Sequence, residues 1–316
     1  MTAPPKVYID GHVGTTGLRI RSWLKHRDDI ELITIPEKWR KDSEARKEHM
    51  LAADISVWCL PDEAAREAAS WLERSQSRVI DASTAHRVDP NWVYGLPEMA
   101  ADQRQRIAQA RRVSNPGCYS STFILLVRPL VEQGLIDKDS PIAIHALSGY
   151  SGGGNKLIDK WEDDPKLRQL GFEAPYALFK QHKHIPEMLR YSGLNTPPQF
   201  VPAVGPFRTG MRVQVPIHAS LLKGKPQDLQ DLFRERYAEH PFVNVVTNKA
   251  IDESSLDPQE CNDSNSLNIH VLCHEHGHVL LVGILDNLGH GASGLAIQNL
   301  NVMLGLDECR GLPKCT

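Results

Sequence analysis

One stretch decides the fold: Val7-Tyr8-Ile9-Asp10-Gly11-His12-Val13-Gly14-Thr15-Thr16-Gly17-Leu18. Its first three residues predict a short apolar strand, and Leu18–Lys25 predicts a helix. The glycines between them permit a tight turn and let backbone N–H groups approach a pyrophosphate, to which the helix N-terminus adds a partial positive charge. The spacing GxxGxxG departs from the GxGxxG fingerprint, so a plain strand-to-helix turn is the alternative. The context favours a dinucleotide site, and the candidate residues are Gly11, Gly14, Thr15, Thr16 and Gly17.

The first third of the chain alternates strand and helix beyond this loop. Ile30–Ile35, Ile55–Leu60 and Arg78–Ala82 have the length and apolar content of buried strands. Asp62–Leu72, rich in alanine, predicts a helix between the last two. This order predicts an α/β fold with a parallel, doubly wound sheet.

The pattern changes near residue 116. Cys118–Glu132 predicts a buried helix, which Pro129 should kink or shorten. Further strands are expected at Ile142–Leu147, Arg212–Leu222, Asn268–His274 and Val279–Leu285, further helices at Leu157–Trp161, Leu229–Ala238 and Gly291–Leu304, and a polar loop at Asp252–Ser266. The mixture predicts an α+β second domain with an antiparallel sheet.

The composition argues against several classes of function. The 316 residues include 36 Lys+Arg and 39 Asp+Glu, a net charge of −3. This balance argues against a generic binder of nucleic acid or anionic membrane, and no apolar run approaches the ~18 residues of a membrane span. None of the 6 cysteines forms a CxxC pair, and no secretory leader is evident. We therefore expect a cytoplasmic protein with free thiols and without nucleic-acid or membrane partners.

The end of the second strand bears on the choice of nicotinamide cofactor. Glu37 occupies the place where an acid holds the ribose 2′-hydroxyl of NAD. Lys38, Arg40 and Lys41 suit the 2′-phosphate of NADP instead, because cations bind that dianion. We predict NADP, with an exposed, solvated charge run as the alternative.

The most informative stretch for chemistry is Ser114-Asn115-Pro116-Gly117-Cys118-Tyr119-Ser120-Ser121-Thr122. The Pro-Gly turn places Cys118 at a helix N-terminus, which stabilises a thiolate. A thiolate attacks acyl carbons readily, so Cys118 is a candidate nucleophile. The alternative is a small buried side chain.

Five segments in order carry a family resemblance: VIDASTAHR (79–87), YGLPE (94–98), NPGCY (115–119), SGYSGGGN (148–155) and DNLGHGASGLAIQNLN (286–301). Together they resemble N-acetyl-gamma-glutamyl-phosphate reductase of the shorter type, from Val7 to about Gly305. The resemblance implies a Rossmann-like NADP-binding domain, residues 1–115 completed by 286–316, and a substrate and oligomerisation domain, residues 116–285, like that of aspartate-semialdehyde dehydrogenase. It implies a homo-oligomer that reduces N-acetyl-glutamyl 5-phosphate with NADPH through a thioester on Cys118.

The resemblance also implies further site residues. It favours His182 as the proton-transfer base, with His184 as the other candidate and Glu187 nearby. It assigns substrate binding to Asn115, Ser148, Glu187 and Arg208, and cofactor binding to Ser83, Gly152, Gly153 and Asn287. A flexible linker is the alternative for the glycine-rich turn, and an ordinary surface arginine is the alternative for Arg208. His290 stands where the family commonly has lysine, and other histidines, His12 among them, are expected at the surface.

Rival functions have their own signatures. His274-Glu275-His276-Gly277-His278 satisfies the zinc-protease pattern HExxH, but its β-branched flanks and glycine predict strand–turn–strand rather than the required helix. We therefore expect no metal. Aspartate-semialdehyde dehydrogenase and a carrier-linked aminoadipate-phosphate reductase share the cysteine chemistry and remain alternatives. A non-enzymatic NADP sensor would need no nucleophilic cysteine.

Overall fold

The computed structural model describes residues 3–247, 252 and 255–314. Residues 1–2 and 315–316 of the predicted domain ranges, and 253–254 of the predicted polar loop, lie outside this set. The described residues of 1–116 and 292–312 form one compact unit, and those of 117–291 and 313–316 form a second. We call them unit 1 and unit 2 and describe each by itself. No helix among the described residues is long and apolar enough to cross a membrane.

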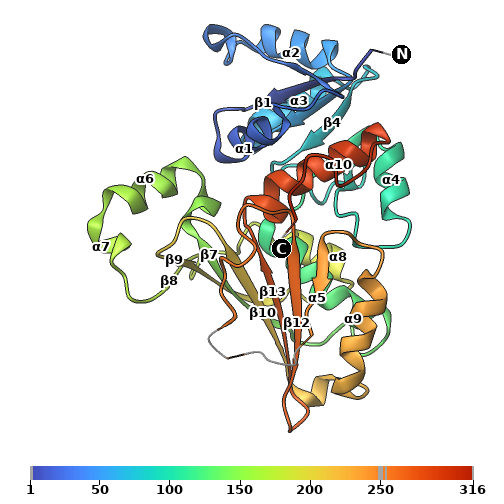
Figure 1. Cartoon of the computed structure of the whole chain (residues 1–316), viewed down its shortest axis with the longest axis vertical. Coiled ribbons are helices and arrows are strands. Elements are labelled where there is room, and N and C mark those ends of the chain that lie inside the picture. The colour runs from blue at the N-terminus through green and yellow to red at the C-terminus, as the bar shows by residue number, and fades with distance from the viewer. Residues whose placement is uncertain (1–2, 248–251, 253–254, 315–316) are drawn as a thin grey trace. The chain divides into compact units, whose positions relative to one another are not determined.

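Unit 1 is built on a six-stranded sheet with the order β2-β1-β3-β4-β6-β5 (Figure 1). Every neighbouring pair is parallel, which confirms the doubly wound sheet. The strands are β1 (Lys6–Asp10), β2 (Glu31–Ile33), β3 (Ile55–Trp58), β4 (Arg78–Asp81), β5 (Val93–Tyr94) and β6 (Arg112–Ser114). A core of Tyr8, Met50, Trp58, Val79 and Trp92 lies against them.

The helices of unit 1 are α1 (Thr15–Leu24), α2 (Ser43–Ala52), α3 (Asp62–Trp71), α4 (Gln103–Gln109) and α10 (Gly294–Leu304), with a 3-10 turn η1 (Glu37–Trp39). Helix α1 begins three residues before the predicted Leu18 because the extended Gly14 serves as its N-cap. The polar segment after β2 has no apolar pattern that would predict an element. It forms η1 and α2, whose start is fixed by the Asp42 carboxylate accepting the Ala45 N–H.

Helix α10 packs against α1, α4 and β4 of the same unit, beside α4 in Figure 1. It is held by buried amides as well as by apolar contacts. Gln298 Nε2 donates to Glu98 Oε1 at 2.7 Å, and Asn299 Nδ2 donates to the Gly95 carbonyl at 2.8 Å. Gly305, with φ +70°, ends the helix as predicted.

Unit 2 contains a seven-stranded sheet with the order β11-β12-β13-β10-β7-β9-β8. Its strands are β7 (Ala143–Gly149), β8 (Ala174–Pro175), β9 (Gln199–Gly205), β10 (Met211–Ile217), β11 (Val243–Val245), β12 (Leu267–Cys273) and β13 (Val279–Leu285). The expected antiparallel sheet is wrong in part, because β7–β9 and β11–β12 are parallel pairs. A parallel pair needs a crossover of a dozen or more residues, and the chain between β7 and β9 supplies one.

One face of this sheet carries α5 (Cys118–Glu132). The helix has the predicted bounds, and the expected shortening at Pro129 does not occur. Proline cannot donate to the Leu125 carbonyl one turn earlier, and Tyr237 Oη donates to that carbonyl at 2.6 Å instead. Gly283 of β13 lets the helix approach, since a Cβ there would lie 2.3 Å from Thr122 Cγ2.

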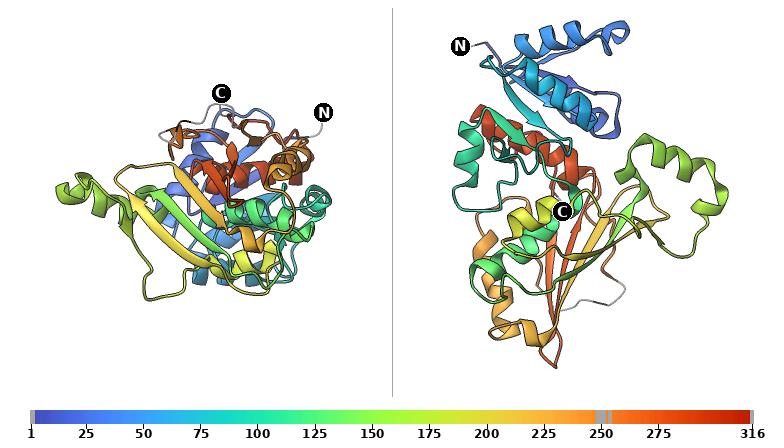
Figure 2. Two further views of the ribbon diagram at one scale, coloured as in Figure 1. Left: turned by 90° about the horizontal axis from the view of Figure 1, so that it is seen from below. Right: turned by 180° about the vertical axis from the view of Figure 1, so that it is seen from behind.

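The other helices of unit 2 are α6 (Asn155–Asp163), α7 (Pro165–Arg168), α8 (Ile185–Ser192) and α9 (Leu229–Tyr237). Helix α8 packs beside α5. Helices α6 and α7 extend away from the sheet of unit 2 in both views (Figures 1 and 2). The segment from α6 to the start of α8 therefore forms a projecting lobe, which meets the sheet at β8 before the chain continues through α8 to β9.

The HExxH segment joins β12 to β13, and the predicted strand–turn–strand is confirmed. The His274 N–H donates to the His278 carbonyl at 2.9 Å, and Gly277 takes φ +83° in the turn. The histidines therefore lack the helical spacing that a zinc protease requires. Within the described ranges, no group of three or more His, Cys, Asp or Glu side chains is arranged to hold a metal ion.

Candidate active site

Cys118 is the first residue of α5, directly after the extended N-cap Gly117. The thiol is half-buried and lies at the end of the helix where unbonded N–H groups and the helix dipole favour an anion. Gly291 of the same unit packs closely against it, since a Cβ there would lie 2.7 Å from Cys118 Cβ. The local structure thus matches the environment expected of a nucleophilic thiolate.

His182 stands in an aromatic cluster with Tyr119, Tyr176 and Phe200. Its Nδ1 accepts the backbone N–H of His184 at 3.1 Å, so the neutral ring carries its proton on Nε2. Nε2 lies 3.2 Å from Tyr176 Oη, which donates onward to Tyr119 Oη at 3.2 Å. Burial raises the pKa of both phenols, so both remain protonated at neutral pH.

His184 and Glu187 form the second part of the same cluster. His184 is 4% exposed, and its Nε2 lies 4.0 Å from Glu187 Oε1. The other carboxylate oxygen, Oε2, accepts the backbone N–H of Gly117 at 3.1 Å. Glu187 therefore connects this histidine to the peptide that precedes Cys118. Unit 2 brings together the predicted nucleophile, both candidate bases and the predicted carboxylate.

The glycine-rich turn after β7 is a compact structure, not a linker. It contains the 3-10 turn Tyr150–Gly153. Gly149 could not be replaced without conflict, because a Cβ would lie 2.5 Å from the Arg208 carbonyl oxygen. A Cβ on Gly152 would lie 3.2 Å from Ser148 Oγ, at the buried end of β7. Ser148, Gly152 and the neighbouring Gly153 therefore lie in one tightly packed turn.

Asn287 and Arg208 lie beside this turn, and both side chains contact other residues of unit 2. Asn287 Oδ1 accepts the Gly210 N–H at 2.8 Å, and its Nδ2 donates to Ser151 Oγ at 2.9 Å. The amide thus joins two loops. The Arg208 guanidinium is 59% exposed and contacts Glu162 Oε1 at 2.5 Å. It is available to an incoming anion only in exchange for this ion pair.

In unit 1 the glycine loop follows β1 as predicted. Gly11 takes φ +80°, and a Cβ there would lie 2.3 Å from the Cys59 carbonyl oxygen. A Cβ on Gly17 would lie 2.5 Å from the Gly11 carbonyl oxygen. Gly14 caps α1, and Thr15 and Thr16 form its first turn. Only glycine fits at the first and third positions, and the turn presents the N-terminus of α1, which is the arrangement a dinucleotide requires.

A pocket of about 470 Å³ adjoins this loop. Its lining includes Gly11, Gly14 and three cations, Arg40, Lys41 and Arg46. Arg46 also holds the buried Asp10 carboxylate at 2.9 Å. Lys38 does not line this pocket; its ammonium lies 4.4 Å above the Trp39 ring. Arg40 thus has the predicted position beside the glycine loop, whereas Lys38 faces elsewhere and Lys41 takes its place.

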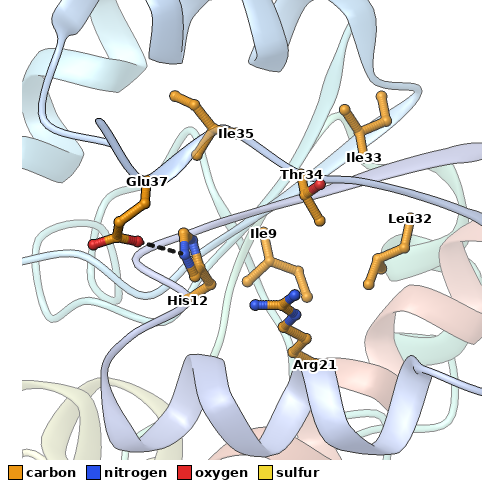
Figure 3. Close-up of a pocket in the computed structure, with 8 residues that line it drawn as sticks. All are labelled: Ile9, His12, Arg21, Leu32, Ile33, Thr34, Ile35 and Glu37. Carbon is orange, nitrogen blue, oxygen red and sulfur yellow. Dashed lines mark ion pairs between the residues drawn. The ribbon is translucent and has the colours of Figure 1, made fainter. Parts of the chain in front are cut away.

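Figure 3 shows a second pocket of about 230 Å³ next to the first. It is lined by Ile9, His12, Arg21, Leu32, Ile33, Thr34, Ile35 and Glu37. His12 lines both pockets, and its Nε2 lies 3.9 Å from Glu37 Oε2. The side chain of His12 is only 16% exposed, so the expectation of an ordinary surface histidine is wrong.

Ser83 follows β4 and belongs to a buried network. Its N–H and hydroxyl donate to the two Asp81 oxygens at 2.9 and 2.7 Å. His86 Nδ1 lies 2.7 Å from Asp81 Oδ2, and the imidazole stacks on Trp92 at 4.1 Å. Because the Ser83 hydrogen points to Asp81, the hydroxyl oxygen can only accept, and it already accepts the Ala85 N–H at 3.1 Å. Sequence reasoning named Ser83 but missed the Asp81–His86 pair behind it.

Asn115, at the end of β6, is 1% exposed. Its Nδ2 donates to the Ala292 carbonyl at 3.0 Å, and its Oδ1 accepts from Asn299 Nδ2 at 3.1 Å. The side chain therefore joins β6 to the start of α10. These hydrogen bonds hold β6 and α10 together, and no motif in the sequence indicates this structural role.

His290 is fully buried in the turn before α10. Its Nδ1 lies 3.0 Å from the Asn265 carbonyl, and desolvation lowers its pKa to about 4. The ring is neutral at physiological pH, so it cannot supply a cation as a lysine would.

Comparisons with known proteins agree with this geometry. Residues 35–109 match the semialdehyde dehydrogenase NAD binding domain, and residues 118–287 match the semialdehyde dehydrogenase dimerisation domain. Among solved structures, aspartate semialdehyde dehydrogenase II of Vibrio cholerae, complexed with ASA, superposes with a TM-score of 0.74 at 12% identity, over 96% of this chain and 99% of that one. Aspartate semialdehyde dehydrogenase with NADP from Candida albicans gives 0.66 at 13% identity, over 96% and 99%. These likenesses establish the fold.

Sequence relatives are more specific. N-acetyl-gamma-glutamyl-phosphate reductase 2 of Pseudomonas putida is 45% identical over 97% of this chain and 99% of its own. The reductase of Brucella ovis is 46% identical over 95% and 99%, and that of Trichormus variabilis 45% over 98% and 99%. At these identities, over nearly the whole of each chain, the protein belongs to the N-acetyl-gamma-glutamyl-phosphate reductase family.

Proposed function

We propose that this protein reduces N-acetyl-L-glutamyl 5-phosphate to N-acetyl-L-glutamate 5-semialdehyde and phosphate, with NADPH as reductant. The observation that carries the proposal is Cys118 at the N-terminus of α5, with His184 and Glu187 connected to it through Gly117. Relatives of that name, at least 45% identical over nearly the whole chain, support the substrate.

In the proposed reaction the Cys118 thiolate attacks the acyl carbon. The carbon–oxygen bond to phosphate breaks, and a thioester on Cys118 remains. Backbone N–H groups at the start of α5 stabilise the oxyanion that forms during the attack. NADPH, when bound, supplies the hydride that reduces this thioester. The carbon–sulfur bond then breaks, its electron pair returns to sulfur, and the aldehyde leaves.

We propose His184, rather than the His182 favoured by resemblance, as the base. A base oriented by a carboxylate is the usual arrangement for activating a nucleophile, and Glu187 lies 4.0 Å from His184. His184 takes the thiol proton and passes it to the departing phosphate. A solvent proton returns to the thiolate at the end of the cycle. His182 is proposed to have a supporting role, because its Nε2 contacts Tyr176 and its Nδ1 accepts the His184 N–H.

The remaining roles follow from the contacts. Gly11, Gly14, Thr15, Thr16 and Gly17, with Arg40, Lys41 and the acceptor Ser83, are proposed to hold NADPH. Ser148, Gly152, Gly153 and Arg208 are proposed for the anionic groups of substrate and cofactor. For Asn115 and Asn287 the hydrogen bonds support bracing roles in place of the expected ligand contacts.

We further propose a homo-oligomer. Residues 118–287 match a dimerisation domain, which supports self-association. The projecting lobe of unit 2 exposes Phe172, Leu178 and Phe179, the last 96% exposed, and a partner subunit would shield such side chains. Light scattering of the purified protein tests this: a monomer mass at micromolar concentration would refute it.

The reaction itself is tested in reverse. The protein is mixed with N-acetyl-glutamate semialdehyde, NADP and phosphate, and NADPH absorbance is followed, with aspartate semialdehyde in a parallel cuvette. Phosphate-dependent NADPH formation from the acetylated substrate alone is expected, and Cys118→Ser should abolish it. Activity with aspartate semialdehyde would reassign the substrate. If the folded protein forms no NADPH in either cuvette, the proposal is refuted.

A further inference from the structure

Glu37 lines the smaller pocket of unit 1 and lies beside Arg40 and His12. Arg40 Nε lies 2.5 Å from its Oε1, and His12 Nε2 lies 3.9 Å from its Oε2. Figure 3 shows the imidazole and the carboxylate facing each other. The Glu37 side chain is 70% exposed and that of Arg40 is 35% exposed, so solvent ions and ligands reach the pair.

The two partners have opposite preferences for the 2′ group of an adenosine ribose. A carboxylate after the second strand accepts a hydrogen bond from a 2′-hydroxyl and repels a 2′-phosphate. A guanidinium binds the phosphate through two parallel N–H···O contacts. Arg40 lines the pocket at the glycine loop, whereas Glu37 lines the neighbouring one.

We propose that Glu37 sets cofactor discrimination by competing with the 2′-phosphate for Arg40. Without a 2′-phosphate, the ion pair neutralises Arg40, and the site tolerates a ribose hydroxyl. A 2′-phosphate takes Arg40 over from Glu37, and the net preference for NADPH is the difference between these two interactions. The inference rests on the proposed function, because it takes the pocket at the glycine loop to be the adenosine site.

The chemistry predicts unequal effects of removing each charge. Glu37→Gln frees Arg40 from its competitor, so affinity for a 2′-phosphate should rise by about fivefold, the upper range for an exposed ion pair. Arg40→Gln removes the phosphate ligand, so the same affinity should fall by about tenfold or more. In the Arg40→Gln background, Glu37→Gln should change little, because the competition no longer exists.

The test uses two fragments that differ only in the 2′ group: adenosine 2′,5′-bisphosphate and adenosine 5′-monophosphate. Their dissociation constants are measured on the full chain through tryptophan fluorescence, since Trp39 lies between Glu37 and Arg40 and is half-exposed. Glu44→Gln is the control: Glu44 is an exposed carboxylate of α2 that pairs with Lys47 and lines neither pocket. The ratio of the two constants reports the discrimination without catalysis.

The expected ratio favours the bisphosphate in the wild type, rises about fivefold in Glu37→Gln, and stays within about twofold of wild type in Glu44→Gln. A Glu37→Gln ratio equal to that of the control would overturn the inference. So would a fivefold rise that persists in the Arg40→Gln background, because direct repulsion would then explain it. If the wild type binds neither fragment nor NADPH, the proposed function fails as well. If it binds and turns over NADPH with unchanged ratios, only the inference fails.

Discussion

Glu98 offers the sharpest test of the packing of α10. The carboxyl group is fully buried, and Oε1 accepts from Gln298. Among the described residues, Oε2 has no hydrogen-bond partner. Desolvation by burial raises the pKa of Glu98 from 4.5 to about 7, against smaller opposing effects of Gln298 and Arg104. We predict that Glu98→Gln stabilises the protein above pH 7.

The magnitude follows from linkage. The folded pKa lies above the unfolded one, so the folded state holds its proton more tightly, and stability falls as the pH rises from about 4.5 to about 7. The difference between the two pKa values corresponds to about 3 kcal/mol at pH 8 and less than about 1 kcal/mol at pH 5. Glutamine keeps the contact with Gln298 and carries no charge. Like the neutral acid, it leaves one polar atom unpartnered, so the variant should gain about 3 kcal/mol at pH 8 only.

The assay is urea unfolding at both pH values, followed by tryptophan fluorescence. Five of the 6 tryptophans, at positions 23, 39, 58, 71 and 92, lie within residues 1–116, so the signal reports mainly on unit 1. Glu67→Gln, on the exposed face of α3, is the control and should change stability by less than about 0.5 kcal/mol. If Glu98→Gln and the wild type lose the same stability between pH 5 and pH 8, the buried carboxyl is not the titrating group and the reasoning fails.

Two further perturbations test other buried groups. Burial lowers the pKa of His290 to about 4, so the folded state favours the neutral ring and stability should be lost as the pH falls from about 6.5 to about 4. His290→Gln should reduce this loss of stability at low pH, as measured by thermal melts. If the loss is unchanged in the variant, burial of His290 is not its cause. Tyr237→Phe should destabilise by about 1–3 kcal/mol, because it leaves the Leu125 carbonyl without its donor. In a Pro129→Ala background, where a backbone N–H is restored, that loss should shrink, and equal losses in both backgrounds would exclude this explanation.

Local sequence signals predicted much of the fold. Helix α5 and strand β13 have the predicted bounds because each is a continuous apolar run closed by clear stop signals. The parallel sheet of unit 1 followed from strand and helix alternation. The parallel β7–β9 pair was missed because β8 and β9 carry weak patterns and the projecting lobe interrupts the crossover from β7 to β9.

Side-chain roles were less predictable, because they depend on which segments meet. Tyr176 contacts His182 from a segment with no motif, and only the folded lobe brings the two together. Lys38 and Arg40 are equivalent candidates in the sequence. In the structure, however, Lys38 lies over the Trp39 ring, whereas Arg40 lines the pocket at the glycine loop. The resemblance assigned Asn287 to a ligand, whereas its hydrogen bonds go to two loops, a distinction that no local pattern carries.

The division of the chain has a consequence for its synthesis on the ribosome. Unit 1 combines residues 1–116 with 292–312, so the partners of Gln298 and Asn299 are made long before α10 exists. At roughly 5–20 residues per second, translation of the intervening segment takes on the order of 10–40 s. During that time the surface that α10 covers stays open to solvent, and residues 117–291 are all made before α10. Most of the second unit is therefore expected to form before the first is complete, and chaperones are expected to protect the incomplete first unit.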